Sequence, residues 1–377
     1  MIMSLHTSHM RLVAGALTIA ALAACGAAPA AAQSLVERAN RGLVEIATSS
    51  TFGTSARMAE DLADVLDDGA TRRIAPVIGK GSLQNLIDVK VMRGIDMAIV
   101  QTDVLEYARQ QHNPPGVETL TYIAKLGNEE FHLLARGDVK SVGELAGKKV
   151  NFGVQGDGTL LTGARIFESL KIKVEATTYD QAQALEKLKS GEIAALAYVA
   201  GKPAPLFVSL RAADNLHFLS IPLKSDMTSA YLPARLTSDD YPGLVGIVGS
   251  VDTVAVGTVL MAANLTPDSD RYRNVANFVD AFFTQFGSLL DPGHHPKWKE
   301  VNLAAELPNW HRFGPADQWI KRNGGAAPAV SMSDQQMRDV FAKFLDERSK
   351  ATGQAMNTQQ KDELFDQFKR WQEGKVR

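Results

Sequence analysis

The fold is decided by the segment LVEIATSSTFGTSARMAEDLADVL, residues 43–66. It opens with an apolar run, 43–47, of the length expected for a buried strand. A turn of small polar residues, 48–55, comes next, and apolar side chains then recur at helical spacing from Met58 to Leu66. The order strand, polar turn, helix is the building unit of a parallel α/β sheet. We therefore expect this segment to begin such a sheet.

The same unit recurs along the chain. The strand expected at 74–78 ends in the turn GKGS, 79–82, and the buried strand at 97–100 ends in QTD, 101–103. Later in the chain, the strand expected at 149–154 is followed by the turn QGDGT and a helix. Since crossovers between parallel strands are right-handed, the alternation predicts parallel sheets. Because the plan starts twice, it predicts two similar α/β lobes.

A long β-branched segment sets the domain organisation. Residues 253–261 are numerous enough to cross back between the lobes as one strand. A long amphipathic helix is expected after it, with apolar positions at Val275, Val279, Phe282, Phe286 and Leu290. A chain of 377 residues is also long for one domain. We predict a discontinuous first lobe, residues 40–136 and 251–323, and an inserted second lobe, residues 137–250.

The last residues, 324–377, read as a separate helical extension. The composition of GGAAP, 324–328, is that of a linker. Ser333 and Gln336 form a capping-box pattern that opens the first of two helices with aromatic faces. We expect these helices to pack on the first lobe, and the alternative is that they bind a partner protein.

The first residues, 1–32, read as an export signal. A basic residue precedes an apolar run, 12–22, that is too short to span a membrane. Two processing sites compete. LAAC, ending at Cys25, resembles the lipobox of bacterial lipoproteins, whereas AAA, 30–32, is the small-residue site of ordinary signal peptidase. The single cysteine of the chain lies at the lipobox position, which favours a lipid anchor. Either route predicts a periplasmic protein without a disulfide bond.

Composition and motifs argue against an enzyme and against nucleic acid. The net charge of −2 lacks the basic excess of a nucleic-acid-binding protein. GDGTLL, 156–161, lacks the third glycine of a dinucleotide fingerprint, and GELAGKK, 143–149, is one residue short of a phosphate loop. His294 and His295 are adjacent rather than spaced for one metal ion, and His311 lies apart. We expect no catalytic residue, no cofactor and no metal.

The polar turns are suited to binding a small molecule. Helix N-termini offer unpaired backbone N–H groups and a partial positive charge, and glycine lets a ligand approach the backbone. In open α/β sheets such turns lie at the carboxyl ends of the strands, where ligands bind. The alternative is that Ser49, Thr54, Ser82 and Thr159 only cap their helices. The expected ligand-binding residues are Ser49, Ser50, Thr54, Ser55, Ser82, Asn85, Gln101, Asp103, Gly156, Gly158, Thr159, Thr162, Tyr198, Gly201 and Pro203.

At these turns the chain resembles the TAXI-type substrate-binding proteins of TRAP transporters. The matching fragments are IATSS with GT at 53–54, GSLQNL at 81–86, DMAIVQTD at 96–103, GEIAA at 191–195 with GKP at 201–203, and YPG at 241–243 before TVAV at 253–256. The resemblance implies a type II periplasmic-binding fold and a monomeric protein. It also implies a small ligand such as an organic acid or amino acid, delivered to the membrane permease of a TRAP transporter.

The chain also departs from this family at its turns. SAR, 55–57, stands where the family usually has a tyrosine pair, Ala194 or Ala195 takes the place of a common aspartate, and Asp157 replaces the serine of Gly-Ser-Gly-Thr. Asp157 puts an anion at a helix N-terminus, where it would repel a ligand carboxylate. These departures and the helical extension leave a second function open, a ligand-sensing partner of a membrane receptor or signalling protein.

Overall fold

The structure, a computed structural model, describes residues 40–51, 53–245 and 249–323. All of them belong to one unit of the chain, Met1–Ala327. The expected export signal with Cys25 and the expected helical extension lie outside the described residues. None of the helices in the described ranges is long and apolar enough to cross a membrane.

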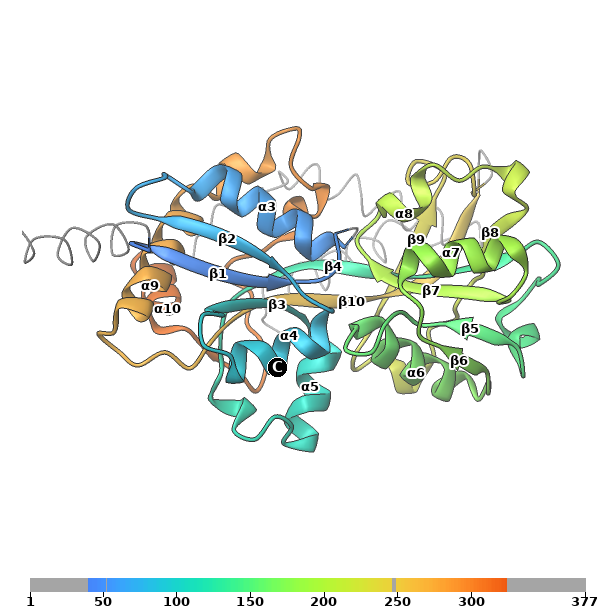
Figure 1. The fold of residues 1–377 in the computed structure, drawn as a ribbon, viewed down its shortest axis with the longest axis horizontal. Helices are drawn as coiled ribbons and strands as arrows, with labels where there is room; N and C mark the ends of the chain where they lie inside the picture. The colour runs from blue at the N-terminus through green and yellow to red at the C-terminus, as the bar shows by residue number, and fades with distance from the viewer. Residues whose placement is uncertain (1–39, 52, 246–248, 324–377) are drawn as a thin grey trace, which may run out of the picture. The chain divides into compact units, whose positions relative to one another are not determined.

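The first lobe begins with three strand–helix units, as the sequence predicts. They are β1 (Leu43–Thr48), α3 (Thr54–Leu66), β2 (Arg73–Ile78), α4 (Ser82–Val91), β3 (Met97–Gln101) and α5 (Thr102–Gln111). Strand β1 lies between β2 and β3 and pairs with both in parallel. Figure 1 shows α3 on one side of these strands and α4 and α5 on the other. The turns after the three strands therefore open at one edge of the sheet.

The second lobe repeats the parallel arrangement on a smaller scale. Its elements are β5 (Lys149–Asn151), α6 (Gly158–Leu170), β6 (Glu175–Thr177), α7 (Gln181–Ser190), β7 (Ala195–Ala200), α8 (Pro205–Val208), β8 (Leu216–Phe218) and β9 (Leu232–Thr237). Strand β5 pairs in parallel with β6 and with β7. The start of α6 and the end of β7 consequently point to the first lobe.

Two long strands join the lobes. They are β4 (Thr121–Arg136) and β10 (Ser250–Ala262), which pair antiparallel and run from one lobe into the other (Figure 1). The sheet order is β2-β1-β3-β10-β4-β7-β5-β6, so one sheet extends through both lobes. Parallel strands at each end of this sheet, joined by the antiparallel crossing strands, give the two-lobed α/β fold that the sequence predicts.

The crossing lies earlier in β4 than the expected boundary at residue 136. Residues 130–135 of β4 already pair with β7 of the second lobe. In β10, residues 250–255 pair with β9, whereas residues 258–262 pair with β3. Both strands are buried along most of their length, including the point in β4 where the partner strand changes.

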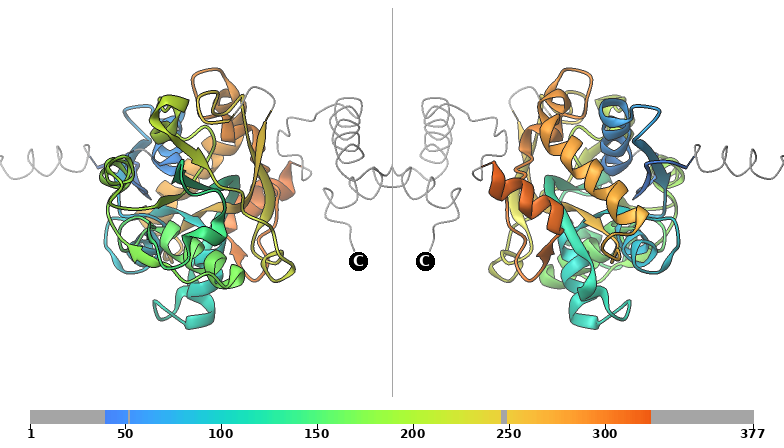
Figure 2. Two further views of the ribbon diagram at one scale, coloured as in Figure 1. Left: turned by 90° about the vertical axis from the view of Figure 1, so that its right-hand side faces the viewer. Right: turned by 90° about the vertical axis from the view of Figure 1, so that its left-hand side faces the viewer.

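The chain after β10 returns to the first lobe. It forms α9 (Asp270–Thr284), the 3-10 turns η5 (Phe286–Leu290) and η6 (Pro296–Glu300), the short strand β11 (His311–Arg312) and α10 (Gly314–Arg322). The views of Figure 2 show α9 in orange and α10 in red-orange at this lobe. The helix expected to reach Leu290 ends at Thr284 instead. Because a 3-10 turn follows, Phe286 and Leu289 are buried and Leu290 is only partly covered.

Each lobe has hydrophobic clusters of its own. In the first lobe, Phe282 and Trp298 are fully buried against Leu62 and other residues of α3 and β1. In the second lobe, Phe152 and Ile166 are buried beneath β5 and β7. Burial of such side chains stabilises each lobe by about 1.5–3 kcal/mol per residue before entropy is subtracted. The clusters of the two lobes are separate, although Leu161 of α6 packs against a cluster of the first lobe.

Candidate functional site

A small cavity lies where the turns of the two lobes meet, and we call it the crevice cavity. Its volume is about 20 Å³, enough for about one water molecule. It lies at the carboxyl ends of β1, β2 and β3, opposite the start of α6 and the end of β7. The lining residues are Ser49, Ser50, Thr54, Ser55, Gly81, Ser82, Ile99, Gln101, Glu129, Asp157, Tyr198, Val199 and Thr258.

Seven of the ligand-binding residues expected from sequence line this cavity, namely Ser49, Ser50, Thr54, Ser55, Ser82, Gln101 and Tyr198. Asn85 instead lies inside the first lobe, where its amide donates to the carbonyl of Ile99 (3.3 Å). The Thr159 hydroxyl accepts a hydrogen bond from the backbone N–H of Val199 (3.2 Å). These two side chains support the walls of the crevice from behind.

The hydroxyl groups of the first lobe do not act as helix caps. The N-cap residues of α3 and α4 are Gly53 and Gly81, and neither helix has a side-chain cap. Thr54 and Ser82 are the first residues inside these helices, so the capping alternative fails for both. The Ser82 hydroxyl accepts a hydrogen bond from the backbone N–H of Gln101 (3.2 Å), which joins two turns of the same wall.

Two acidic side chains face the same cavity, and sequence reasoning missed one of them. Glu129 lies near the middle of β4 and is 8% exposed. Its carboxylate accepts a hydrogen bond from the Gln101 amide (3.3 Å). Burial raises the pKa of Glu129 to about 7, because a charge in this site loses its hydration. The signal in the sequence was an acidic pair, Glu129 and Glu130, in the middle of a strand that is buried along most of its length.

The other acidic side chain caps a helix. Asp157 is the N-cap residue of α6, and its carboxylate accepts from the backbone N–H of Thr159 (2.9 Å). Burial raises the pKa of this carboxyl to about 6, although the hydrogen bond from Thr159 works in the opposite direction. The chain thus places its own carboxylate at the helix N-terminus, as the departure from the Gly-Ser-Gly-Thr pattern predicts.

Polar atoms in the crevice cavity have unused hydrogen-bonding capacity. The Oε1 atom of Gln101 has no partner among the described residues, although the side chain is only 3% exposed. Leaving a buried polar atom unpaired costs about 1–3 kcal/mol. Proteins retain such groups where a ligand completes the bonding, and the position of Gln101 in the cavity wall is consistent with this use.

The lobes contact each other directly around the cavity. The backbone N–H of Gln84 donates to the carbonyl of Gly156 (3.1 Å), and the N–H of Gly201 donates to the Thr54 hydroxyl (2.7 Å). A Cβ atom at Gly158 would lie 1.9 Å from Gln101 Oε1, so only glycine permits this approach. Pro203, which was also expected to bind the ligand, is exposed to solvent and not part of these contacts. The structure therefore represents a closed crevice.

A buried aspartate closes one side of the crevice. Asp103 lies in the first turn of α5 and is 1% exposed. Its carboxylate accepts hydrogen bonds from the hydroxyls of Thr162 (2.6 Å) and Tyr231 (3.0 Å) in the other lobe. Burial raises the pKa of Asp103, and the two hydroxyls lower it. Asp103 and Thr162, both expected as ligand-binding residues, are thus bonded to each other across the interface.

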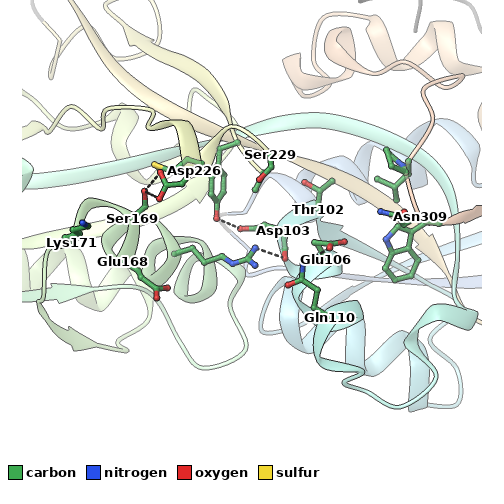
Figure 3. A pocket seen from close by; sticks show the side chains of 17 residues that line it. Thr102, Asp103, Glu106, Gln110, Glu168, Ser169, Lys171, Asp226, Ser229 and Asn309 are labelled. Atoms are coloured by element: carbon green, nitrogen blue, oxygen red, sulfur yellow. Dashed lines mark hydrogen bonds between the residues drawn. The ribbon is translucent and has the colours of Figure 1, made fainter. Parts of the chain in front are cut away.

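A wider pocket lies beyond Asp103, and we call it the seam pocket. Its volume is about 790 Å³. Figure 3 shows Glu168 and Ser169 of α6 on one side, facing Glu106 and Gln110 of α5 on the other. Residues Ser225–Met227 (η4) and the loop 307–310 complete its wall. Most of its charged groups are partly or fully exposed, so the pocket is an open gap between the lobes.

Metal ligation is not indicated in the described part of the chain. No group of three or more His, Cys, Asp or Glu side chains there is arranged to hold an ion. His295, considered as a metal ligand at the sequence level, accepts a hydrogen bond from the backbone N–H of Lys297 and caps η6. Its role is local packing.

The profile of the NMT1-like family matches residues 46–289, which include both lobes and every residue of the crevice cavity. The chain belongs to the NMT1-like family. Solved structures similar to this NMT1-like chain include periplasmic binding protein BugD, with 15% identity over 74% of this chain and 93% of that one and a TM-score of 0.46. The alkanesulfonate-binding protein SsuA from Xanthomonas axonopodis pv. citri has 14% identity over 81% and 93%, with a TM-score of 0.42. The methionine-binding protein MetQ has 13% identity over 64% and 90%, with a TM-score of 0.37.

Proposed function

We propose that this protein binds a small solute in the crevice cavity and closes its two lobes around it, outside the cytoplasm. The observation that carries the proposal is the cavity itself, because turns from both lobes line it and hydrogen bonds between the lobes seal it. A site that is completed only on closure couples ligand binding to a change of shape. This coupling is what a transport receptor needs.

The proposal extends to transport. The resemblance of the turns to TAXI-type proteins suggests delivery to the permease of a TRAP transporter, with an organic acid or amino acid as the first expectation for the ligand. BugD, SsuA and MetQ are named as binding proteins, which agrees with this class of function. The expected export signal would place the mature chain in the periplasm, with Cys25 as its lipid anchor if the lipobox is used.

Small-angle scattering tests closure. The full chain is purified from its host, unfolded in guanidinium to release bound solute, refolded, and measured with and without the released material. We expect the radius of gyration to fall when the material is returned, with the hinge where β4 and β10 cross. The Thr54→Val variant, which lacks the acceptor for the Gly201 N–H, should close less completely. An unchanged radius at saturation would contradict the receptor function.

A further inference from the structure

We propose that the ligand of the crevice cavity carries a protonated amine or another cationic nitrogen group, which Glu129, Asp157 and Gln101 receive. This inference rests on the proposed solute-binding function and deepens it by naming the charge of the solute. It narrows the expectation of an organic acid or amino acid, which came from the resemblance alone, to solutes that carry a basic nitrogen.

The charges at the cavity are all of one sign. Among the described residues that line it, Glu129 and Asp157 are acidic and there is no lysine, arginine or histidine. The nearby Lys297 is buried behind this wall, where its ammonium contacts Glu130 and Glu300, each at 2.7 Å. Its charge is balanced by these carboxylates. A ligand anion would therefore meet two acidic side chains, with no lysine, arginine or histidine among the described lining residues to offset their negative charge when they are ionised.

The helix N-termini do not reverse this conclusion. The N-termini of α4 and α6 both approach the crevice, and such termini attract anions. Asp157 already occupies this position. Its carboxylate accepts from the Thr159 N–H at the start of α6, and a Cβ atom at Gly81, the N-cap of α4, would lie 3.3 Å from its Oδ1. The protein thus supplies its own anion at the start of α6, close to the start of α4, whereas the start of α3, where Thr54 and Ser55 line the cavity, has no acidic cap.

Two polar atoms of the cavity-lining residues have no partner among the described residues: Gln101 Oε1, which is an acceptor, and the Tyr198 hydroxyl, which can accept or donate. The Gln101 amide nitrogen donates to Glu129, which leaves Oε1 of the same amide without a partner, in close approach to Gly158 at the edge of the cavity. Gln101 and Glu129 therefore present oxygen atoms side by side. An ammonium group has three N–H donors and no acceptor, so it matches these oxygens and neutralises part of the buried negative charge. A carboxylate would place more acceptors against them.

The size of the cavity limits how much of the ligand it holds. A volume of about 20 Å³ accommodates a group of one or two heavy atoms, such as an ammonium, when the lobes are closed. The remainder of a larger solute would lie among the hydroxyls of Ser49, Ser50 and Ser55, with the lobes slightly further apart. Hydroxyl groups donate as well as accept, so this part of the site does not restrict the rest of the solute to one charge.

The test uses the full chain purified from its host. The solute released by guanidinium is identified by mass spectrometry, and part of it is N-acetylated. Calorimetry then measures the binding of both forms to refolded wild type, Glu129→Gln and Asp157→Asn. The Glu129→Gln change is isosteric, and asparagine keeps the cap of α6, so both variants should fold. Glu118→Gln, an exposed change outside the crevice, is the matched control.

We expect a released compound with a basic nitrogen. Acetylation, Glu129→Gln and Asp157→Asn should each weaken its binding by about 10- to 100-fold, the scale of a lost charge-assisted hydrogen bond. Glu118→Gln should bind as wild type does. A compound without a basic nitrogen, or equal affinity for the acetylated form, overturns the inference and leaves solute binding intact.

If no compound is released, the melting temperature of the protein is measured with four small probes. Ethanolamine and putrescine carry an amine, and ethylene glycol and glycolate do not. Stabilisation by the amines alone supports the inference, stabilisation by glycolate overturns it, and no stabilisation by any probe overturns both proposals.

Discussion

The crevice cavity and the seam pocket lie on either side of Asp103. The larger of the two would be the first choice for a ligand site by size, but the smaller one has the features of such a site. The seam pocket has a volume of about 790 Å³ and the crevice cavity about 20 Å³. The crevice cavity is lined by two acidic side chains with raised pKa values, Glu129 and Asp157, and by the unpaired amide oxygen of Gln101. The seam pocket has one buried carboxyl, Asp103, which the Thr162 and Tyr231 hydroxyls already bind. Volume measures the gap left between two lobes, whereas incomplete bonding of buried groups indicates where a ligand belongs.

The largest effect should come from the residue that separates the two spaces. Asp103→Ala leaves the buried hydroxyls of Thr162 and Tyr231 without their acceptor, which costs about 2–5 kcal/mol in the free energy of unfolding. Thermal or urea unfolding measures it. Glu106→Ala, next to the seam pocket on the same helix, should cost about 0.5 kcal/mol or less, since Glu106 is partly exposed. Equal losses would contradict the assignment of Asp103 as the seal.

The pH dependence of stability should distinguish the crevice from ordinary surface carboxyls. The folded-state pKa of Glu129, about 7, lies above the value of 4.5 expected for the unfolded chain. The folded state therefore holds more protons between these values, and stability is lost as the pH rises from about 4.5 to 7. The loss amounts to about 3 kcal/mol at most. Urea unfolding of ligand-free protein at pH 5 and pH 8 measures it.

Glu129→Gln should lack this part of the pH dependence, because glutamine does not titrate. Glu118→Gln should retain it, because the exposed side chain of Glu118 lies outside the crevice. If the two variants follow the same pH profile as wild type, Glu129 is not a buried carboxyl of raised pKa, and the contrast between the two spaces weakens.

A moderate effect is expected at a crevice hydroxyl. Ser82→Ala removes an oxygen from the cavity wall and should weaken binding of the released solute by about 3- to 10-fold, while the free energy of unfolding changes by about 1 kcal/mol or less. Thr159→Ala makes a useful comparison, because its hydroxyl also accepts a backbone N–H, that of Val199, but does not line the cavity, so its loss should reduce stability with less effect on binding. Calorimetry and urea unfolding separate the two. Affinity unchanged in Ser82→Ala would remove this residue from the site.

The smallest effect should come from the seam pocket. Glu168→Ala removes an exposed carboxylate from its wall, and we expect solute affinity within about twofold of wild type and stability within about 0.5 kcal/mol. Calorimetric titration is the measurement. Were this variant to lose binding while Ser82→Ala kept it, the larger pocket would be the ligand site and the comparison would be reversed.

Sequence patterns were most informative where a residue's role depends on its near neighbours. The strand–turn–helix order predicted β1, β2 and β3 and the turns that follow them, because hydrophobic periodicity and polar turns are local properties. The same patterns overestimated the helix that begins at Asp270, since a 3-10 turn after Thr284 preserves apolar spacing. They also placed the lobe boundary late, because β4 remains buried where its partner strand changes.

What the sequence by itself determined is the two-lobed α/β plan and the small polar turns that face each other across it. Only the tertiary structure decided which side chains of those turns meet. Gln101 and Glu129 are 28 residues apart and become hydrogen-bonding neighbours only when β3 and β4 are both paired with β10. Thr159 lies two residues after the crevice residue Asp157, yet its hydroxyl is used inside the lobe. The charge of a site is a sum over residues that are distant in the chain, and no local pattern contains that sum.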